Sequence, residues 1–186
     1  MEWILASASP RRKELFCKLV ETFEIIPATG EENAGNLTGA KLVETLATQK
    51  AQEVASLPVA KDKAVLGADT IVCLNGEVLG KPKDEADARR MLSALSGNTH
   101  EVFTGVCISY PKGGTRQTLV SSDCTKVRFL PLSQAQIKAY IQTGSPMDKA
   151  GAYGIQDGGL VASIVGSESN VVGLPIELCK ELISKL

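Results

Sequence analysis

The chain has 186 residues, of which 44% are hydrophobic and 22% charged, a composition that fits one large or two small globular units and argues against disorder. The chain has 20 basic and 21 acidic residues. With a formal charge of −1, the molecule as a whole has no positive electrostatic potential that would attract a nucleic-acid polymer. Any anionic ligand must therefore be held by a local group of side chains.

The first third of the chain predicts a strand, a helix, a second strand and a long helix. Residues 3–6 are a short apolar run, and Ser9 followed by Pro10 is typical of a helix start. Residues 23–26 read as a second strand, and residues 28–36 as a polar loop. From Thr38 to about Ser56 the apolar residues recur at helical spacing, which predicts an amphipathic helix.

The middle of the chain predicts hairpins separated by one helix. An apolar strand over 64–68 is expected to end at Asp69, and a second extended run folds back at Asn75-Gly76. Asp84 begins a helix that Gly97 ends. Residues 99–110 and 116–129 predict a long antiparallel hairpin through the sequence Pro-Lys-Gly-Gly.

The last third predicts a helix, a glycine-rich loop, a strand and a final helix. Ser133 and Gln136 form a capping box for a helix through Gln142. The segment "KAGAYGIQDGG" leads to a strand near 160–165, and a helix begins at Pro175. No repeat or linker divides the chain, and the alternation predicts an α/β fold with a mixed β-sheet and flanking helices.

The cysteines and the hydropathy of the sequence indicate the cellular compartment of the protein. Five cysteines are scattered without C-x-x-C spacing, which predicts reduced core thiols rather than a zinc site. No stretch approaches the roughly 20 apolar residues that cross a bilayer. We expect a cytoplasmic protein with no membrane partner.

The stretch "LASASPRRKEL", residues 5–15, is the first candidate site. Backbone N–H groups at a helix start carry partial positive charge, and Arg11 and Arg12 follow them at once. Arginine presents a planar fork that suits phosphate oxygens. A solvated first helical turn is the alternative, although cations are unfavourable there because of the helix dipole.

Four acidic or basic positions are further candidates. Asp69 follows a buried strand, where a carboxylate could hold a divalent cation or take a proton from water; the alternative is a turn aspartate. Lys81 in "GKPKD" is either a ligand contact or a surface lysine. Glu31 and Glu32 repel one another and would gain from a cation, but such pairs are often only solvated.

The segment "DKAGAYGIQDGG", residues 148–159, is a candidate ligand loop. Its glycines permit close backbone approach, and Lys149, Tyr153 and Gln156 supply polar groups. A flexible linker is the alternative.

Missing motifs narrow the chemistry. His100 is the only histidine, so Ser-His-Asp or Cys-His catalysis and a His-rich zinc site are disfavoured. Neither G-x-x-x-x-G-K-[ST] nor a strand followed by G-x-G-x-x-G occurs. The remaining features are cationic side chains that suit phosphates, carboxylates that suit a hard metal ion, and a glycine-rich loop. Together they indicate a site for a phosphorylated small molecule.

Taken in order, "LASASPRRKEL", "TGEEN", "LGADTIV", "GKPKD", "LSGNTHEVFTGV" and "DKAGAYGIQDGG" resemble the Maf family of nucleoside triphosphate pyrophosphatases. The resemblance runs from about residue 4 to the "VVGLP" segment. It implies one domain over residues 1–186 with two lobes around a cleft, of the inosine-triphosphatase-like kind, and a homodimer. It also implies hydrolysis between the α and β phosphates with Mg²⁺ or Mn²⁺, as a house-cleaning activity linked to cell-division arrest.

The resemblance also implies roles for individual residues. Asp69 corresponds to the proton acceptor, while Arg11, Thr70 and Gln156 accompany substrate choice in the subgroup acting on dTTP and UTP. Phosphate and metal contacts carry over to Ser7, Arg12, Glu32, Lys50, Lys81 and Lys149. Glu32 and Asp69 are the expected metal ligands.

Two departures and two alternatives stay open at this point. Asp157 stands where the family often has glycine, and Ser145 where it often has glutamate. A purine-directed enzyme acting on ITP, XTP or 7-methyl-GTP is one alternative. A regulator of septum formation that binds nucleotides without hydrolysing them is the other.

Overall fold

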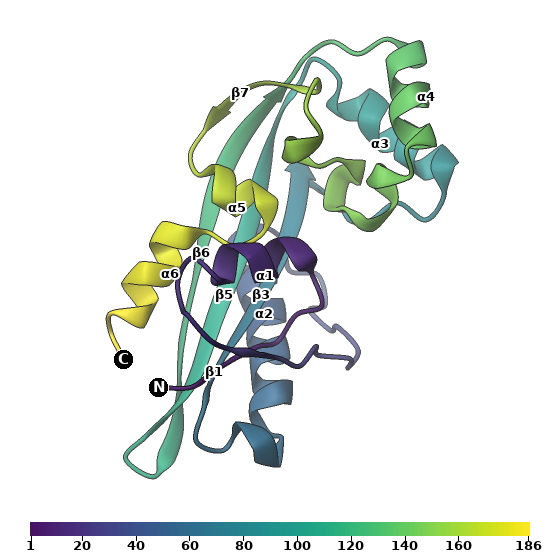
Figure 1. Ribbon diagram of the computed structural model, residues 1–186. Helices are drawn as coiled ribbons and strands as arrows, with labels where there is room; N and C mark the ends of the chain where they lie inside the picture. Colours follow the sequence, from purple (N-terminus) through teal and green to yellow (C-terminus); the bar gives the residue numbers. More distant parts are fainter.

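The computed structural model describes residues 1–186, which form a mixed seven-stranded sheet with helices on both faces (Figure 1). The strand order is β2-β1-β3-β5-β6-β7, and β4 pairs with β3 beyond the end of β1. Strand β1 is parallel to β2 and β3, and all other pairs are antiparallel. The predicted α/β class with a mixed sheet is confirmed.

The bounds of the elements follow the sequence pattern closely. The strands are β1 (Trp3–Leu5), β2 (Glu24–Ile25), β3 (Ala64–Leu74), β4 (Glu77–Leu79), β5 (Thr99–Lys112), β6 (Thr115–Phe129) and β7 (Val161–Val165). The helices are α1 (Pro10–Phe16), α2 (Gly39–Ala55), α3 (Glu85–Leu95), α4 (Gln134–Gln142), α5 (Glu168–Val172) and α6 (Ile176–Ile183). Four 3₁₀ turns complete the list: η1 (Pro58–Ala60), η2 (Ser145–Asp148), η3 (Ala150–Ala152) and η4 (Ile155–Asp157).

Side-chain caps fix three helix starts where the sequence predicts them. Ser9 accepts from the Arg12 amide at 3.4 Å, and Asp84 accepts from the Asp87 amide at 2.8 Å. The capping box of Ser133 and Gln136 is present with both hydrogen bonds. These bonds satisfy amides that have no partner inside a helix.

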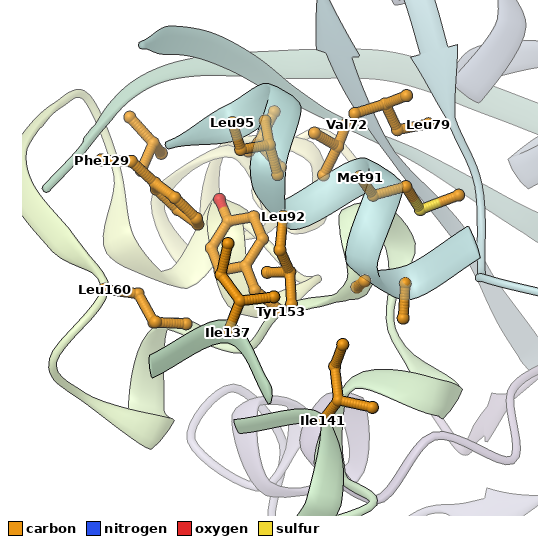
Figure 2. Packing of buried hydrophobic residues seen from close by; sticks show 14 residues of the cluster. Val72, Leu79, Met91, Leu92, Leu95, Phe129, Ile137, Ile141, Tyr153 and Leu160 are labelled. Atoms are coloured by element: carbon orange, nitrogen blue, oxygen red, sulfur yellow. The ribbon is translucent and has the colours of Figure 1, made fainter. Parts of the chain in front are cut away.

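The sheet carries two lobes, which Figure 1 shows at opposite ends of the long β5–β6 hairpin. The distal lobe is built on α3, α4 and the turns η2 and η3, and its core contains Leu92, Phe129, Ile137 and Tyr153 (Figure 2). In the proximal lobe, α1 and α6 pack on one face of the sheet, which includes β1, and α2 packs on the other. Two packed cores therefore share one sheet.

Strand β3 corrects one prediction from the sequence. The strand does not end at Asp69: it continues to Leu74 because the alternating residues after Asp69 go on pairing with β5, as far as Cys73 opposite Glu101. What ends near Leu66 is the pairing with β1, and pairing with β4 begins only at Val72. Residues 67–71 therefore line a gap in the sheet between β1 and β4.

Two smaller features also differ from expectation. Helix α5 is absent from the sequence prediction, although Ser167 caps it and Gly173 follows its last residue. The cysteines are not all in the core, since Cys17 and Cys124 are exposed. No helix has both the length and the apolar character needed to span a bilayer.

Candidate active site

A cavity of about 490 Å³ opens where β3 lacks a neighbour between β1 and β4. This volume lies within the range of roughly 300–1,000 Å³ typical of small-molecule sites. Successive side chains of a strand point to opposite faces, so Asp69 faces α2 whereas Thr70 faces α1 and α5. Through the gap, groups from both faces of the sheet reach one cavity.

Nearly all of the candidate residues meet at this cavity. Those that line it are Arg11, Arg12, Glu32, Lys50, Asp69, Thr70, Lys81, Lys149, Tyr153 and Gln156. Two candidates do not line it: Glu31 is exposed, and Ser7 is buried, with its Oγ 3.4 Å from Arg12 Nη1. Arg11 and Asp69, which are 58 positions apart in the chain, thus share one hollow.

Lys50 on α2 lies between two carboxylates. Its Nζ is 2.5 Å from Asp69 Oδ1 and 2.8 Å from Glu32 Oε1. Asp69 is only 8% exposed, so the ion pair between Lys50 and Asp69 is largely shielded from water. Asp69 Oδ2 makes no hydrogen bond and is therefore open to a ligand or a water molecule.

Arg12 is held by acceptors from three parts of the chain. Its Nε donates to the Gly173 carbonyl at 2.9 Å, and its Nη2 donates to Thr70 Oγ1 at 3.1 Å. Burial lowers the pKa of the guanidinium, and the nearby carboxylates of Asp69 and Glu32 act in the opposite direction. With the bond to Ser7 counted, one N–H on each Nη nitrogen remains for a ligand.

Arg11 and Lys149 are both bound to Asp148. Arg11 Nη1 lies 3.1 Å from Asp148 Oδ2, which joins α1 to the turn η2 across the cavity. Lys149 Nζ donates to Asp148 Oδ1 and to both oxygens of Ser145 at 2.6–2.9 Å. All three N–H donors of Lys149 are thus used within the protein. Although burial opposes it, these bonds hold the pKa of Asp148 below its usual value.

Lys81 and Gln156 are the free polar groups of the cavity. Both side chains are exposed, and neither forms an ion pair or a hydrogen bond with the rest of the chain. An unpaired cation and an unpaired amide at the rim are free to bind a ligand without breaking a contact of the protein.

The two departures from the family pattern contact one another. Ser145 Oγ donates to Asp157 Oδ2 at 2.7 Å, and Tyr140 donates to the same oxygen at 2.5 Å. Although burial opposes it, these two bonds hold the pKa of Asp157 below its usual value. The 3₁₀ turn η4 that carries Gln156 is thereby tied to α4, which keeps the loop in place.

Two cavity groups have no counterpart among the candidates from the sequence. The Gly173 carbonyl follows the five-residue helix α5, which is too short for the sequence to show a helical period. Asp148 belongs to the quoted loop motif, but the spacing of the motif does not reveal an ion pair with Arg11, 137 positions away.

The carboxylates suit a divalent cation that also binds phosphates. Glu32 and Asp69 already converge on one positive charge, the Lys50 ammonium. Mg²⁺ is commonly bound by one or two carboxylates together with substrate phosphates and water. No group of three or more His, Cys, Asp or Glu side chains forms a complete protein metal site, so phosphate oxygens and water would have to supply the remaining ligands.

Comparison with known proteins gives a consistent result. A family model described as "Maf-like protein" matches residues 2–186. A dTTP/UTP pyrophosphatase of Clostridium perfringens is 47% identical over 180 residues, covering 95% of this chain and 92% of that protein. One of Carboxydothermus hydrogenoformans is 46% identical over 185 residues, covering 98% and 97%.

A solved structure shares the fold at low sequence identity. The Ham1 protein of Staphylococcus aureus superposes with a TM-score of 0.58 at 17% identity, covering 100% of this chain and 99% of that one. The likeness shows the same architecture of a mixed sheet with flanking helices.

Proposed function

The chain belongs to the Maf family, and from its cavity we propose that it hydrolyses dTTP and UTP to the nucleoside monophosphate and pyrophosphate. The resemblance stated from the sequence motifs points to the same activity. The relatives that are nearly half identical over almost their full length carry this activity in their names.

One observation carries the proposal: five cationic side chains and two convergent carboxylates line a single cavity. A triphosphate bears close to four negative charges, which repel an attacking water unless they are neutralised. A binder of phosphate alone would gain nothing from carboxylates at this place. A hydrolase needs one to accept a proton.

We assign the proton transfer to Asp69. Its Oδ1 is held by Lys50, whereas its Oδ2 is free and can accept the proton of the attacking water. Glu32 would hold Mg²⁺ or Mn²⁺ together with the phosphates, and Asp69 would contribute Oδ1, so that Oδ2 stays available for the proton. When bound, such an ion neutralises phosphate charge and lowers the pKa of a coordinated water.

We assign binding of the phosphate tail to Arg12 and Lys81. Arg12 retains two N–H donors directed by a rigid frame, and Lys81 is a free cation. Ser7 supports Arg12, and Lys149 supports the loop that ends in Gln156.

We assign choice of the base to Arg11, Thr70 and Gln156. A site built from hydrogen-bonding groups rejects bases that leave those groups unpaired. Gln156 has both an amide donor and an acceptor free, which matches the mixed donor and acceptor edge of thymine or uracil.

The test is a substrate panel with the purified chain. We expect dTTP and UTP to give monophosphate and pyrophosphate in the presence of Mg²⁺ or Mn²⁺, with slower turnover of CTP, ITP, XTP and 7-methyl-GTP. Chromatography of the products distinguishes pyrophosphate from orthophosphate. Preference for a purine nucleotide, or binding without turnover, would contradict the proposal and favour one of the two alternatives.

The proposal includes a homodimer. Light scattering coupled to size-exclusion chromatography gives the mass in solution directly. A mass equal to the monomer's 19.7 kDa would contradict this part alone.

A further inference from the structure

A chain of hydroxyl groups leads from Arg12 to a residue that does not line the cavity. Thr70 on β3 lies directly opposite Thr104 on β5, and their Oγ1 atoms are 2.9 Å apart. Thr104 is completely buried, and its Oγ1 lies 2.8 Å from the backbone carbonyl of Asn170 in α5. At the other end, Arg12 Nη2 lies 3.1 Å from Thr70 Oγ1.

The chemistry of the two ends fixes the direction of every bond. The Asn170 carbonyl can only accept, so Thr104 donates its proton there. Thr104 then has only lone pairs for Thr70, so Thr70 must donate to Thr104. Thr70 in turn has only lone pairs for Arg12, whose guanidinium can only donate.

The end of the chain is itself fixed in place. Asn170 is completely buried, and its Nδ2 donates at 2.9 Å to the Val102 carbonyl and to Thr125 Oγ1. The acceptor for Thr104 therefore sits on a short helix that is bonded to β5 and β6 through side-chain contacts. Figure 1 shows α5 beside α1 on that face of the sheet.

We propose that Thr104 is a positioning residue: because it accepts the hydrogen bond that the Thr70 hydroxyl donates, Thr70 presents only lone pairs to Arg12 and orients the guanidinium for the phosphates. The same bond leaves Thr70 no proton to offer to the cavity. Thr70 then cannot donate to a phosphate oxygen, but it can accept from a donor on the nucleoside, such as the imide N–H of thymine or uracil. This inference rests on the proposed function for the identity of the ligand.

The first test is a double-mutant cycle on dTTP hydrolysis. Thr104→Val removes the hydroxyl with little change of shape, and we expect kcat/KM to fall about tenfold, mainly through a higher KM, as for one lost hydrogen bond. Thr70→Val should cost at least as much. In the Thr70→Val background, Thr104→Val should cost nothing further, because its effect passes through Thr70. If the double variant instead loses kcat/KM by the product of the two single-variant losses, the two residues act independently and the proposal is overturned.

Two matched variants separate positioning from stability. Thr104→Ser keeps the hydroxyl and should retain kcat/KM within about twofold. Thr125→Val removes an equally buried hydroxyl that holds α5 through Asn170 and Ser167 but lies outside the chain to Arg12. It should lower the melting temperature, and because the bond to the Val102 carbonyl still holds Asn170, it should reduce kcat/KM clearly less than Thr104→Val does. An equal loss of kcat/KM in Thr125→Val would show a general effect of loosening α5 and overturn the proposal.

A binding measurement separates this inference from the proposed activity. Calorimetry with a non-hydrolysable α,β-methylene analogue of dTTP and Mg²⁺ needs no turnover. We expect Thr104→Val to weaken binding about tenfold and Thr104→Ser to match the unsubstituted chain. Equal affinity in all three proteins overturns the role of Thr104, whereas tight binding without hydrolysis of dTTP overturns only the proposed activity.

Discussion

At the scale of single residues, the ion pair of Lys50 with Asp69 determines how the carboxylate is presented to the cavity. Asp69 lies in the middle of a buried strand and is 8% exposed, a place where an unpaired charge would be costly. Lys50 offsets that cost from one side through Oδ1. The remaining oxygen faces the cavity as a charged acceptor.

Asp69→Asn should lower turnover by two to four orders of magnitude and preserve the fold. The amide cannot accept the proton of water, and loss of a general base costs on the order of 10²–10⁴ in rate. Lys50 keeps Glu32 as its partner, so the melting temperature should change little. Steady-state hydrolysis of dTTP together with circular dichroism measures both. Glu31→Gln is the matched control, because Glu31 is exposed and does not line the cavity.

Lys81→Gln should raise KM for dTTP about tenfold without affecting stability. Lys81 has no partner in the protein, so the fold loses no contact when its charge is removed. Phosphate binding loses one cation. Lys83→Gln removes an equivalent charge two residues away that does not line the cavity, and it should leave KM unchanged. Equal effects of the two substitutions on KM would indicate a general field rather than a contact.

Residue chemistry identified candidate side chains from sequence, but it did not give their partners. Arg12 and Asp69 stand out because of their type and local context. Thr104 does not, since a buried threonine in a strand is ordinary, and its importance arises only from the register that sets it against Thr70. Register between strands 34 positions apart is not encoded in a local pattern.

At the scale of elements, two glycines allow α2 to lie against the sheet. A side chain at Gly105 on β5 would lie 2.3 Å from the Val43 carbonyl oxygen, and one at Gly67 on β3 would lie 2.5 Å from that of Ala47. Both contacts are with helix backbone, which cannot turn away as a side chain can. This close approach of α2 to the sheet brings Lys50 on α2 within ion-pair distance of Asp69 on β3.

Gly105→Ala should therefore destabilise the protein by about 2 kcal/mol or more. The added methyl group forces α2 away from β5, and unfolding in urea should show the loss. Activity should fall as well, because Lys50 moves with α2. Gly80→Ala is the control for stability: nothing lies within 4 Å of its added Cβ, and its φ is not positive. A Gly105→Ala protein as stable as the Gly80→Ala protein would contradict this account of the packing.

The elements that the sequence predicted well have strong local signals. The caps at Ser9, Asp84 and Ser133 lie within one turn of the residues they bind, so local sequence contains both partners. Helix α5 has only five residues, too few for a helical period to be recognised. The break predicted at Asp69 is wrong because hydropathy marks the carboxylate as a strand end, whereas pairing with β5 continues through it.

At the scale of the whole molecule, the cavity depends on both lobes, and the distal lobe depends on a neutral histidine. His100 is 2% exposed and packs edge-on against Phe129 and Tyr153. Its Nε2 lies 2.7 Å from the Tyr153 hydroxyl, whereas its Nδ1 has no partner. Tyr153 also lines the cavity, so this contact links the distal core to the site.

Global stability should therefore fall as the pH drops from about 6.5 to 4. Burial lowers the pKa of His100 from 6.5 to about 4 in the folded state, so over this interval the unfolded chain binds a proton that the folded chain does not. The contribution of His100 to the free energy of unfolding is fully present above pH 6.5, the pKa of the unfolded chain. It decreases as the pH falls toward 4, the pKa of the folded chain, with a total loss of about 3 kcal/mol. Urea unfolding at several pH values measures it.

His100→Gln isolates this contribution from that of the carboxylates. His100 is the only histidine, so no other imidazole titrates in this range. The carboxylates whose pKa values are lowered, among them Asp148 and Asp157, also destabilise the fold in acid, but they do so equally in both proteins. The difference in unfolding free energy between the two proteins should therefore change by about 3 kcal/mol between pH 7 and pH 4. Parallel curves would mean that His100 is accessible to protons in the native state, and that the distal core is looser than its packing indicates.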